Sequence, residues 1–376
     1  MEEHNLNNVI KSSEFSQIPE NSYLKFNEIS NLNNNYDTDD YLSDLLKVLK
    51  LKILVVGVGG AGNSVVSRLQ EIGITGTETL NINTDAQDLY YSNSEKKILI
   101  GKEKCKGQGS GNNPIIGLEA AEEDIDRIKK LLNADIVFLT CGLGGGTGTG
   151  AAPIIAREAK KNGAITVSIC TIPFKSEGNQ RRMGAKAGLK KLAEFSDSIL
   201  TLPNDNLLQL LPNTPILTCF KVMDEVLVRS IKEVVNLVNN CNLINIDFAD
   251  VKKVFEKNSK YPSGLIGITE TLGNEQDIIQ KSKLAIHNPL LKLNAKEIDR
   301  CLISVSSDHK LSLTNVDRIV NTISNEVPHE AKLKFGVKIS PDLDTKIRIM
   351  VLGRGPISPY VRSAVDSENN FAFESL

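Results

Sequence analysis

The stretch Gly144-Gly145-Gly146-Thr147-Gly148-Thr149-Gly150 follows the apolar run Ile136–Leu139 and precedes a segment that favours a helix from Pro153 onward. A second stretch of this kind, Gly57-Val58-Gly59-Gly60-Ala61-Gly62-Asn63, follows the apolar run Ile53–Val56. Of the 27 glycines in the chain, 17 lie between residues 57 and 150, so glycine is concentrated in this region. Because glycine leaves backbone N–H groups uncovered and adopts positive φ without steric cost, such loops can wrap an anion. The two stretches therefore predict a polyphosphate site.

Continuous apolar runs recur along this part of the chain and alternate with helical segments. Besides 53–56 and 136–139, the sequence contains Ile165–Cys170 and Ile199–Leu202. Strands that are apolar along their whole length are typical of a parallel sheet covered by helices on both faces. Ligands of such sheets bind at the carboxyl ends of the strands, where both glycine-rich stretches fall. We therefore expect an α/β fold in which a Rossmann-like parallel-sheet domain binds a nucleotide.

A long helix is expected after Pro215, because apolar residues recur there at helical spacing. These residues are Val222, Met223, Val226, Leu227, Ile231, Val234, Val235 and Val238. Beyond them the sequence indicates a smaller α/β domain, with strands near Leu302–Val305 and Ile347–Leu352. We expect a mostly disordered N-terminal tail at 1–50 with a short amphipathic helix near 41–50, followed by a nucleotide-binding domain at 51–217. The central helix at 218–241 then leads into the C-terminal domain at 242–355, which includes a loop at 243–250. A short tail at 356–376 ends the expected order.

Composition argues against several classes of protein. The formal net charge is −2, so no global basic field would draw the chain to nucleic acid. A run of about 18 apolar residues is lacking, and so is the apolar core of a signal peptide, so we expect a cytoplasmic protein that does not span a membrane. The six cysteines lie singly, which favours reduced core thiols over disulfides or a zinc site.

The first glycine-rich stretch alone leaves two functions open. The pattern Gly57-x-Gly59-x-x-Gly62 after a strand is also typical of dinucleotide-binding enzymes, and Asp85 stands where their ribose ligand would be. A nucleotide-dependent oxidoreductase is therefore an alternative. A dinucleotide fold needs only one such loop, however, whereas two phosphate-binding loops on neighbouring strands suit a nucleoside triphosphate better. A Walker-type loop is excluded, because the sequence has no Gly-Lys-Ser/Thr.

Taken together, the motifs resemble the tubulin/FtsZ family of GTPases over roughly residues 51–352. The stretch 144–150 is similar to the family signature, and four further segments resemble FtsZ rather than eukaryotic tubulin. These segments are Asn83-Thr84-Asp85-Ala86-Gln87, Pro173-Phe174-x-x-Glu177-Gly178, Pro203-Asn204-Asp205 and Asn245–Asp250. The cytosolic, tail-extended form of the chain most resembles an archaeal FtsZ. The loop Gly107–Asn113 departs from the family pattern, because Ser110 and Asn112 stand where small residues are usual.

The resemblance implies GTP and GDP as ligands, with Mg²⁺ as the accompanying ion and its protein ligands unknown. It assigns phosphate binding to Gly60, Ala61, Gly62, Asn63, Ser64, Gly145, Gly146, Thr147 and Gly148, and contact with the terminal phosphate to the loop of Gly109 and Gly111. It assigns the ribose side of the nucleotide to Glu177 and Arg181, guanine to Asn204 and Asp224, and activation of the attacking water to Asp247 and Asp250.

The chemistry of Asp224 agrees with the guanine assignment. A carboxylate accepts hydrogen bonds from both N1–H and the N2 amine of guanine, whereas adenine has an acceptor at N1 and no N2 amine. An unpaired buried polar group costs about 1–3 kcal/mol, which is enough to select one base. Without the resemblance, Asp224 would more simply be a solvated acid on a helix face.

The positions of Asp224 and Asp247 predict an active site shared between subunits. The two residues are 23 positions apart, which is roughly 35 Å along a mostly helical segment. One nucleotide cannot contact both, so Asp247 would act on a nucleotide held by another copy, and head-to-tail contacts that do not close form filaments. We expect an assembly-dependent GTPase that forms homopolymers at the cell division site, with either tail as a site for membrane-tethering or division partners. A regulatory or non-division paralogue is the alternative.

Overall fold

The computed structural model describes residues 51–239, 243–244, 246–308, 311–340, 343 and 345–367. The expected N-terminal tail and its helix near 41–50 lie outside the described residues. None of the helices within the described ranges is long and apolar enough to cross a lipid bilayer.

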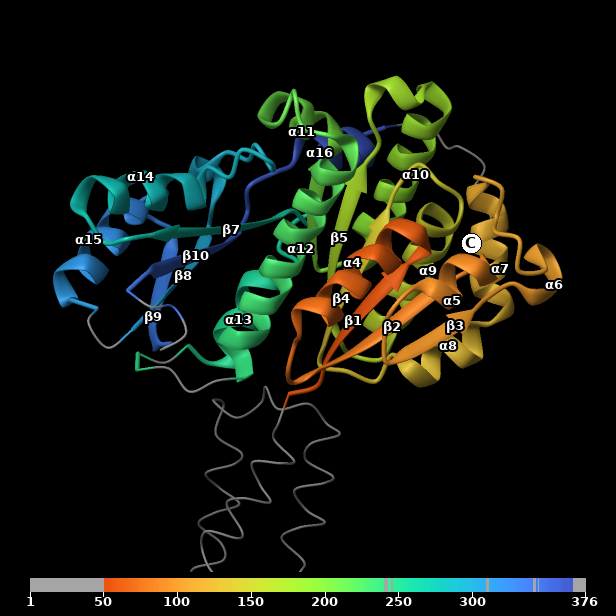
Figure 1. Ribbon diagram of the computed structural model, residues 1–376, viewed down its shortest axis with the longest axis horizontal. Helices are drawn as coiled ribbons and strands as arrows, with labels where there is room; N and C mark the ends of the chain where they lie inside the picture. The colour runs from red at the N-terminus through yellow and green to blue at the C-terminus, as the bar shows by residue number, and fades with distance from the viewer. Residues whose placement is uncertain are drawn as a thin grey trace, which may run out of the picture. The chain divides into compact units, whose positions relative to one another are not determined.

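Six strands form one sheet in the order β3-β2-β1-β4-β5-β6 (Figure 1). They are β1 (Ile53–Val58), β2 (Thr77–Asn83), β3 (Lys96–Leu99), β4 (Ile136–Gly142), β5 (Ile165–Ile172) and β6 (Ser198–Pro203). Every neighbouring pair is parallel, which confirms the predicted α/β fold. The chain winds from β1 toward one edge and from β4 toward the other, so the strand order reverses between these two strands. Both glycine-rich stretches follow strands at this reversal.

Helices cover both faces of the six-stranded sheet (Figure 1). They are α4 (Gly59–Ile72), α5 (Ala86–Tyr91), α6 (Lys102–Cys105), α7 (Pro114–Glu123), α8 (Ile125–Leu131), α9 (Thr147–Lys161), α10 (Asn179–Phe195), α11 (Asn204–Leu210) and α12 (Ile216–Asn239). Alternate residues of β1 belong to different cores. Ile53 and Val55 pack in the core of α4 and α12, whereas Leu54 and Val56 pack in the core of α7, α8, α9 and α10. This alternation explains why the strands read as continuous apolar runs.

A second, four-stranded sheet has the order β7-β10-β8-β9. Its strands are β7 (Gly264–Thr271), β8 (Arg300–Ser307), β9 (Lys332–Ile339) and β10 (Ile347–Arg354), and the helices that follow α12 are α13 (Phe248–Phe255), α14 (Glu275–Ile286), α15 (Leu313–Ser324) and α16 (Pro359–Val365). Strand β10 is antiparallel to β7 and β8, while β8 and β9 are parallel, so this is a mixed sheet. The expected smaller α/β domain is confirmed.

Helix α12 lies between the two sheets and packs in a core that includes residues of both (Figure 1). Val228, Ile231, Val234 and Val235 on its apolar face are fully buried. The helix begins at Ile216, two residues before the expected start, directly after a proline that suits the first turn of a helix. One buried helix therefore joins the two domains.

Two expectations from the sequence were wrong. Helix α9 begins at Thr147 rather than at Pro153, which lies inside it. Glycines enter the helix because α7 passes so close that a Cβ on Gly150 would lie 2.0 Å from the carbonyl oxygen of Pro114. The expected short tail from 356 contains α16, in which Val361 and Ala364 are fully buried in the core shared with α10. A proline in the first turn and apolar residues three apart would have indicated this helix.

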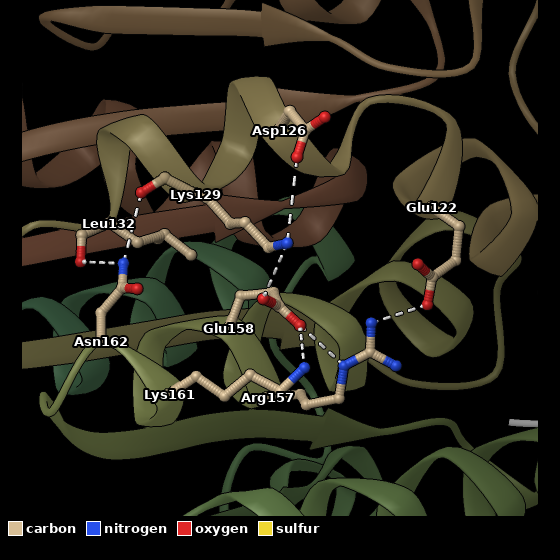
Figure 2. Close-up of polar contacts among 8 residues, drawn as sticks. All are labelled: Glu122, Asp126, Lys129, Leu132, Arg157, Glu158, Lys161 and Asn162. Atoms are coloured by element: carbon tan, nitrogen blue, oxygen red, sulfur yellow. Dashed lines mark hydrogen bonds and ion pairs between the residues drawn. The ribbon is translucent and has the colours of Figure 1, made fainter.

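The second half of α9 is fixed by a buried carboxylate, Glu158 (Figure 2). Its oxygens lie 2.8 Å from Arg157 Nε, 3.0 Å from Lys161 Nζ and 3.7 Å from Lys129 Nζ of α8. Arg157 continues the network to Glu122 of α7 at 2.8 Å. Burial alone would raise the pKa of Glu158, but Lys161 and Arg157 outweigh it and hold the pKa below its usual value. The network ties α7 and α8 to the helix whose first turn contains the glycine-rich stretch.

We predict that Glu158→Gln destabilises the protein by about 1–3 kcal/mol at pH 7, because it leaves three clustered cations without their counter-charge. A depressed pKa stabilises the folded state above the usual pKa of the group, and this contribution is lost as the pH falls through the folded-state pKa. The difference between variant and wild type should therefore shrink in acid. Urea unfolding at several pH values measures it. Glu119→Gln breaks the exposed pair with Lys104 and should change stability by less than about 1 kcal/mol; equal losses for the two variants would contradict the prediction.

Candidate functional site

Two long helices begin side by side at the reversal of the six-stranded sheet, and neither has a side-chain cap. The residues before them, Val58 and Gly146, make no capping hydrogen bond to α4 or α9. A Cβ on Gly59, whose φ is +70°, would lie 3.1 Å from the backbone nitrogen of Gly148, so the two starts are in contact. The first N–H groups of a helix are unpaired and form the positive end of its dipole. Two such ends together make an anion site.

Three buried hydroxyl groups connect the loops around this anion site. Thr147 Oγ1 lies 2.7 Å from Thr84 Oγ1 and 3.1 Å from Ser110 Oγ. Thr84 follows β2, and its carbonyl oxygen accepts a hydrogen bond from Gly109 N at 3.1 Å. The loop of Gly109 and Gly111, which the resemblance places at the terminal phosphate, therefore lies against the start of α9.

Polar side chains hold the first turn of α4 from within. The Asn63 amide, oriented so that its bonds are satisfied, donates to the carbonyl oxygens of Gly57 and Gly59 at 3.0 and 3.3 Å. Ser64 Oγ donates to the carbonyl oxygen four residues earlier, at 3.1 Å. These two side chains hold the turn in place. The predicted segment 60–62 directly precedes them, and its backbone is what a ligand could contact.

Glu177 and Arg181 lie one helical turn apart and form an ion pair. Glu177 Oε1 also accepts a hydrogen bond from Phe174 N at 2.8 Å. Arg181 Nη2 donates to Asn112 Oδ1 at 3.2 Å, so this pair is linked to the loop at 107–113. Asn112, one of the two residues that depart from the family pattern, thus joins the predicted ribose and phosphate sides of the site.

A cavity of about 110 Å³ lies beside the first turn of α4. It brings together Ala61 of that turn, Asn204 at the start of α11 and Asp224 of α12. Its other lining residues are Val65, Thr140, Cys141, Thr171, Phe220 and Met223. None of the residues that the structure describes donates a hydrogen bond to the Asn204 or Asp224 side chain. Both polar groups therefore remain available to a ligand in the cavity.

The environment of Asp224 makes its charged form less stable than in water. Burial raises the pKa of Asp224 to about 6, although the charge of Arg68 opposes the change. A ligand that donates N–H groups to this carboxylate would stabilise the charged form instead. A partly buried carboxyl group with a raised pKa that lines a cavity is typical of a binding site.

Asp247 and Asp250 lie at the start of α13. Asp247 caps the helix through the hydrogen bond that Asp250 N donates to Asp247 Oδ1 at 2.8 Å, and Asp247 N donates in return to Asp250 Oδ2 at 3.2 Å. This is the reciprocal arrangement of a capping box. Asp250 also forms an ion pair with Lys334 of β9. Asp247 precedes the helix and Asp250 lies in its first turn, so the two carboxylates flank the start of α13.

Helix α12 separates these carboxylates from the nucleotide-side residues. It has 24 residues, which is roughly 36 Å at about 1.5 Å per residue. Asp224 lies in its first half, whereas α13 follows its other end (Figure 1). Within one chain the structure brings together the residues predicted for phosphate, ribose and base, and keeps Asp247 and Asp250 away from them.

The described residues contain neither a metal cluster nor a disulfide. Within those ranges no group of three or more His, Cys, Asp or Glu side chains could hold a metal ion. The five cysteines there are free, and burial raises the pKa of Cys141 and of Cys301 to about 12. Cys105, Cys141, Cys170 and Cys301 are buried, whereas Cys219 is partly exposed.

Two residues near the predicted site, Phe220 and Lys334, were not identified from the sequence alone. Phe220 lines the cavity one helical turn before Asp224, and the spacing i, i+4 on the helix could have indicated it. Lys334 is 84 positions from Asp250, and no local pattern relates the two.

Comparisons with known proteins agree with this geometry. The family model described as "Tubulin/FtsZ family, GTPase domain" matches residues 52–212, and the one described as "FtsZ family, C-terminal domain" matches residues 263–355. Cell division protein FtsZ of Methanothermobacter thermautotrophicus is 40% identical over 360 residues, which are 96% of this chain and 91% of the relative. Cell division protein FtsZ 1 of Pyrococcus horikoshii is 43% identical over 324 residues, 86% of each protein.

Solved structures give the same relationship. The FtsZ dimer of M. jannaschii is similar with a TM-score of 0.76 at 40% identity, over 85% of this chain and 93% of that one. CetZ2 of Haloferax volcanii has a TM-score of 0.71 at 20% identity, over 84% and 96% of the two chains, a likeness of fold alone. The oxidoreductase alternative is wrong, since both matched domains are those of another family. With both domains matched, and with this identity to archaeal relatives across nearly its whole length, the chain belongs to the tubulin/FtsZ family and is a GTPase.

Proposed function

We propose that this chain binds GTP at the reversal of its parallel sheet, hydrolyses it with carboxylates from a neighbouring copy, and assembles head-to-tail into filaments for cell division. The observation that supports this most is the separation of the two halves of the site by the part of α12 that follows Asp224. The names of the relatives, cell division protein FtsZ, support the cellular role. A structure of one relative is titled an FtsZ dimer, which supports self-assembly.

Base recognition rests on Asn204 and Asp224, which line the same cavity and keep their polar atoms available. Asp224 accepts the N1–H and N2 amine of guanine, and Phe220, one turn earlier on α12, offers its ring to the base. An adenine in this position would leave the carboxylate buried without a donor, at a cost of about 1–3 kcal/mol. The pocket therefore selects guanine.

We predict that Asp224→Asn weakens GTP binding by about 10- to 100-fold and erodes the preference over ATP, because the amide cannot accept both guanine donors. The same change should stabilise the empty protein at pH 7. A raised carboxyl pKa lowers stability progressively as the pH rises from about 4 through about 6. The stabilisation should therefore be absent below about pH 4. Competition binding with GTP and ATP, together with melting temperatures across this pH range, measures both effects. An unchanged preference for GTP would exclude the assignment.

The phosphates would bind to the backbone of segment 60–62 and of the first turn of α9, with Thr147 beside them. Mg²⁺ is proposed to accompany them, since it usually keeps several waters and takes one or two carboxylates besides the phosphates. Asp85 fits this need. Its Oδ1 caps α5, while a Cβ on Gly109 would lie 3.5 Å from its Oδ2, so this oxygen faces the loop assigned to the terminal phosphate. The ion would neutralise charge on the phosphates.

We predict that Gly145→Val and Gly146→Val both abolish GTP binding, but for different reasons. A Cβ on Gly146 would lie 2.1 Å from Ser110 Oγ, so that variant distorts the loops themselves. The nearest atom to a Cβ on Gly145 would be Asn112 Oδ1, 4.0 Å away, so the empty loop tolerates the side chain, which would then occupy the space of the phosphates. Nucleotide binding and circular dichroism distinguish the two cases. Undiminished binding by the Gly145 variant would place the phosphates elsewhere.

Exposed apolar side chains lie near both ends of α12. Leu208, Leu210, Ile216 and Leu217 are exposed around its first residues, and Leu243 and Ile244 are exposed beyond its last. Different surfaces at two ends of one molecule form a heterologous contact when copies stack, and such a contact propagates into a filament. Stacking would bury both sets and bring Asp247 and Asp250 to the neighbour's phosphates.

We predict that Asp247→Ala binds GTP normally but does not hydrolyse it, because its own pocket is intact and the carboxylate it offers is missing. Asp224→Ala should bind GTP poorly yet still offer a complete loop at 243–250. A mixture of the two should recover phosphate release, and wild-type specific activity should rise with protein concentration. Phosphate release is measured for each variant, for the mixture and for a wild-type dilution series. Concentration-independent activity without recovery in the mixture would place the whole active site in one chain.

We also propose where the filament acts and what its terminal segments bind. The filament would act at the division site, and the terminal segments would bind membrane-tethering or division partners. An active GTPase in the Asp247 test would also argue against the regulatory paralogue, which would bind GTP without hydrolysing it.

A further inference from the structure

Edge strand β9 supports the segment that leads to the proposed catalytic carboxylates. Leu243 N donates to Val337 O at 2.7 Å, and Val337 N donates to Ile244 O at 3.2 Å, so this segment pairs with β9. A Cβ on Gly336 would lie 2.5 Å from Ile246 Cδ1, so the glycine lets Ile246 pack directly on the strand. The strand therefore fixes the path of the chain before Asp247.

A charged side chain of the same strand, Lys334, contacts Asp250. Lys334 Nζ donates to Asp250 Oδ2, the oxygen that also accepts from Asp247 N. Two donors on one oxygen restrict the rotation of the carboxylate. Among the described residues no donor reaches Asp250 Oδ1, so that oxygen remains available to a water molecule. Burial alone would raise the pKa of Asp250, but the hydrogen bonds from Lys334 and Asp247 outweigh it and hold the pKa below its usual value.

A lysine on an edge strand has a simpler explanation, because such lysines discourage unwanted strand pairing. Lys332 of β9 provides the comparison. It lies two residues before Lys334, hence on the same side of the strand, and it is exposed. Its ammonium group has no carboxylate partner among the residues that the structure describes. Protection of the edge would apply to both lysines, whereas the ion pair with Asp250 belongs to Lys334 alone.

We propose that Lys334 is a positioning residue of the shared active site, which holds Asp250 in place so that its second oxygen orients the attacking water on the neighbouring copy's GTP. The inference rests on the proposed role of Asp250. Hydrolysis of a phosphoanhydride depends mainly on positioning and charge stabilisation, so a carboxylate fixed before assembly contributes more than one that rotates freely. Lys334 forms and breaks no covalent bond in this role.

The test compares full-length Lys334→Met, Lys334→Arg and Lys332→Met proteins with wild type. Methionine keeps the length and apolar stem of lysine but removes the charge. Lys334→Met should lower kcat for GTP hydrolysis by about 10-fold or more with unchanged GTP affinity, because only the position of the water is lost. Lys334→Arg should recover activity to within about threefold of wild type, since guanidinium also pairs with a carboxylate. Lys332→Met should match wild type. The measurements are GTP binding, sedimentation of polymer and phosphate release.

Mixing adds a second criterion. Lys334→Met has an intact pocket and Asp224→Ala has an intact Lys334, so the mixture should recover hydrolysis if the lysine acts across the subunit contact. Wild-type turnover by Lys334→Met, or equal losses in the two methionine variants, would overturn the inference. If Lys334→Met fails to bind GTP or to sediment, Lys334→Gln takes its place with the same expectation. An Asp250→Ala protein that still hydrolyses GTP would instead overturn the proposed function, so the two failures are distinguishable.

Discussion

The buried face of α12 is the constraint on which the arrangement of this protein depends. Its apolar residues pack in a core that includes both sheets, so the helix cannot shorten or bend without exposing part of that core. Its length places the cavity of Asp224 near one end and the loop of Asp247 beyond the other. The separation of nucleotide and carboxylates is thus a consequence of core packing. With the proposed roles of Asp224 and Asp247, such a chain completes its chemistry only when one copy lies against another.

Backbone groups make the proposed phosphate site, where two adjacent helices begin without a side-chain cap. Helices α7, α14 and α15 begin with Asn113, Asn274 and Ser312, whose side chains occupy the first N–H groups. Helices α4 and α9 follow Val58 and Gly146, which supply no side-chain cap; α8, α10, α11 and α16 also lack one, but only α4 and α9 begin in contact with each other at the reversal of the sheet. A cap normally stabilises a helix by about 1 kcal/mol, so two adjacent helices without one are less stable when the site is empty. An anion bound there would supply the missing hydrogen bonds.

Features encoded by a short run of neighbouring residues could be predicted from the sequence. Features that depend on residues far apart in the chain could not. The parallel sheet followed from apolar runs, and the glycine-rich stretches followed from their position after those runs. Strand β9 was missed because its mixed sheet leaves polar residues such as Lys332 and Lys334 within the strand. Strands β2, β3 and β7 were not predicted from the sequence either. The start of α9 was misplaced because helix propensity disfavours glycine, whereas close packing against α7 requires it. The ion pair of Lys334 with Asp250 depends on the fold of the second domain, which no short pattern encodes.

Two carboxylates, Glu158 and Asp224, show how surroundings rather than residue type decide a role. Glu158 lies among Arg157, Lys161 and Lys129, its charge is fully compensated, and its pKa is depressed (Figure 2). Asp224 lies in a cavity without a donor from the described residues, and burial raises its pKa to about 6. The first arrangement stabilises the folded chain whether or not a ligand is present. The second is unfavourable without a ligand and becomes favourable only when a ligand supplies the donors, so part of the proposed affinity for guanine would come from relieving a cost that the fold itself imposes.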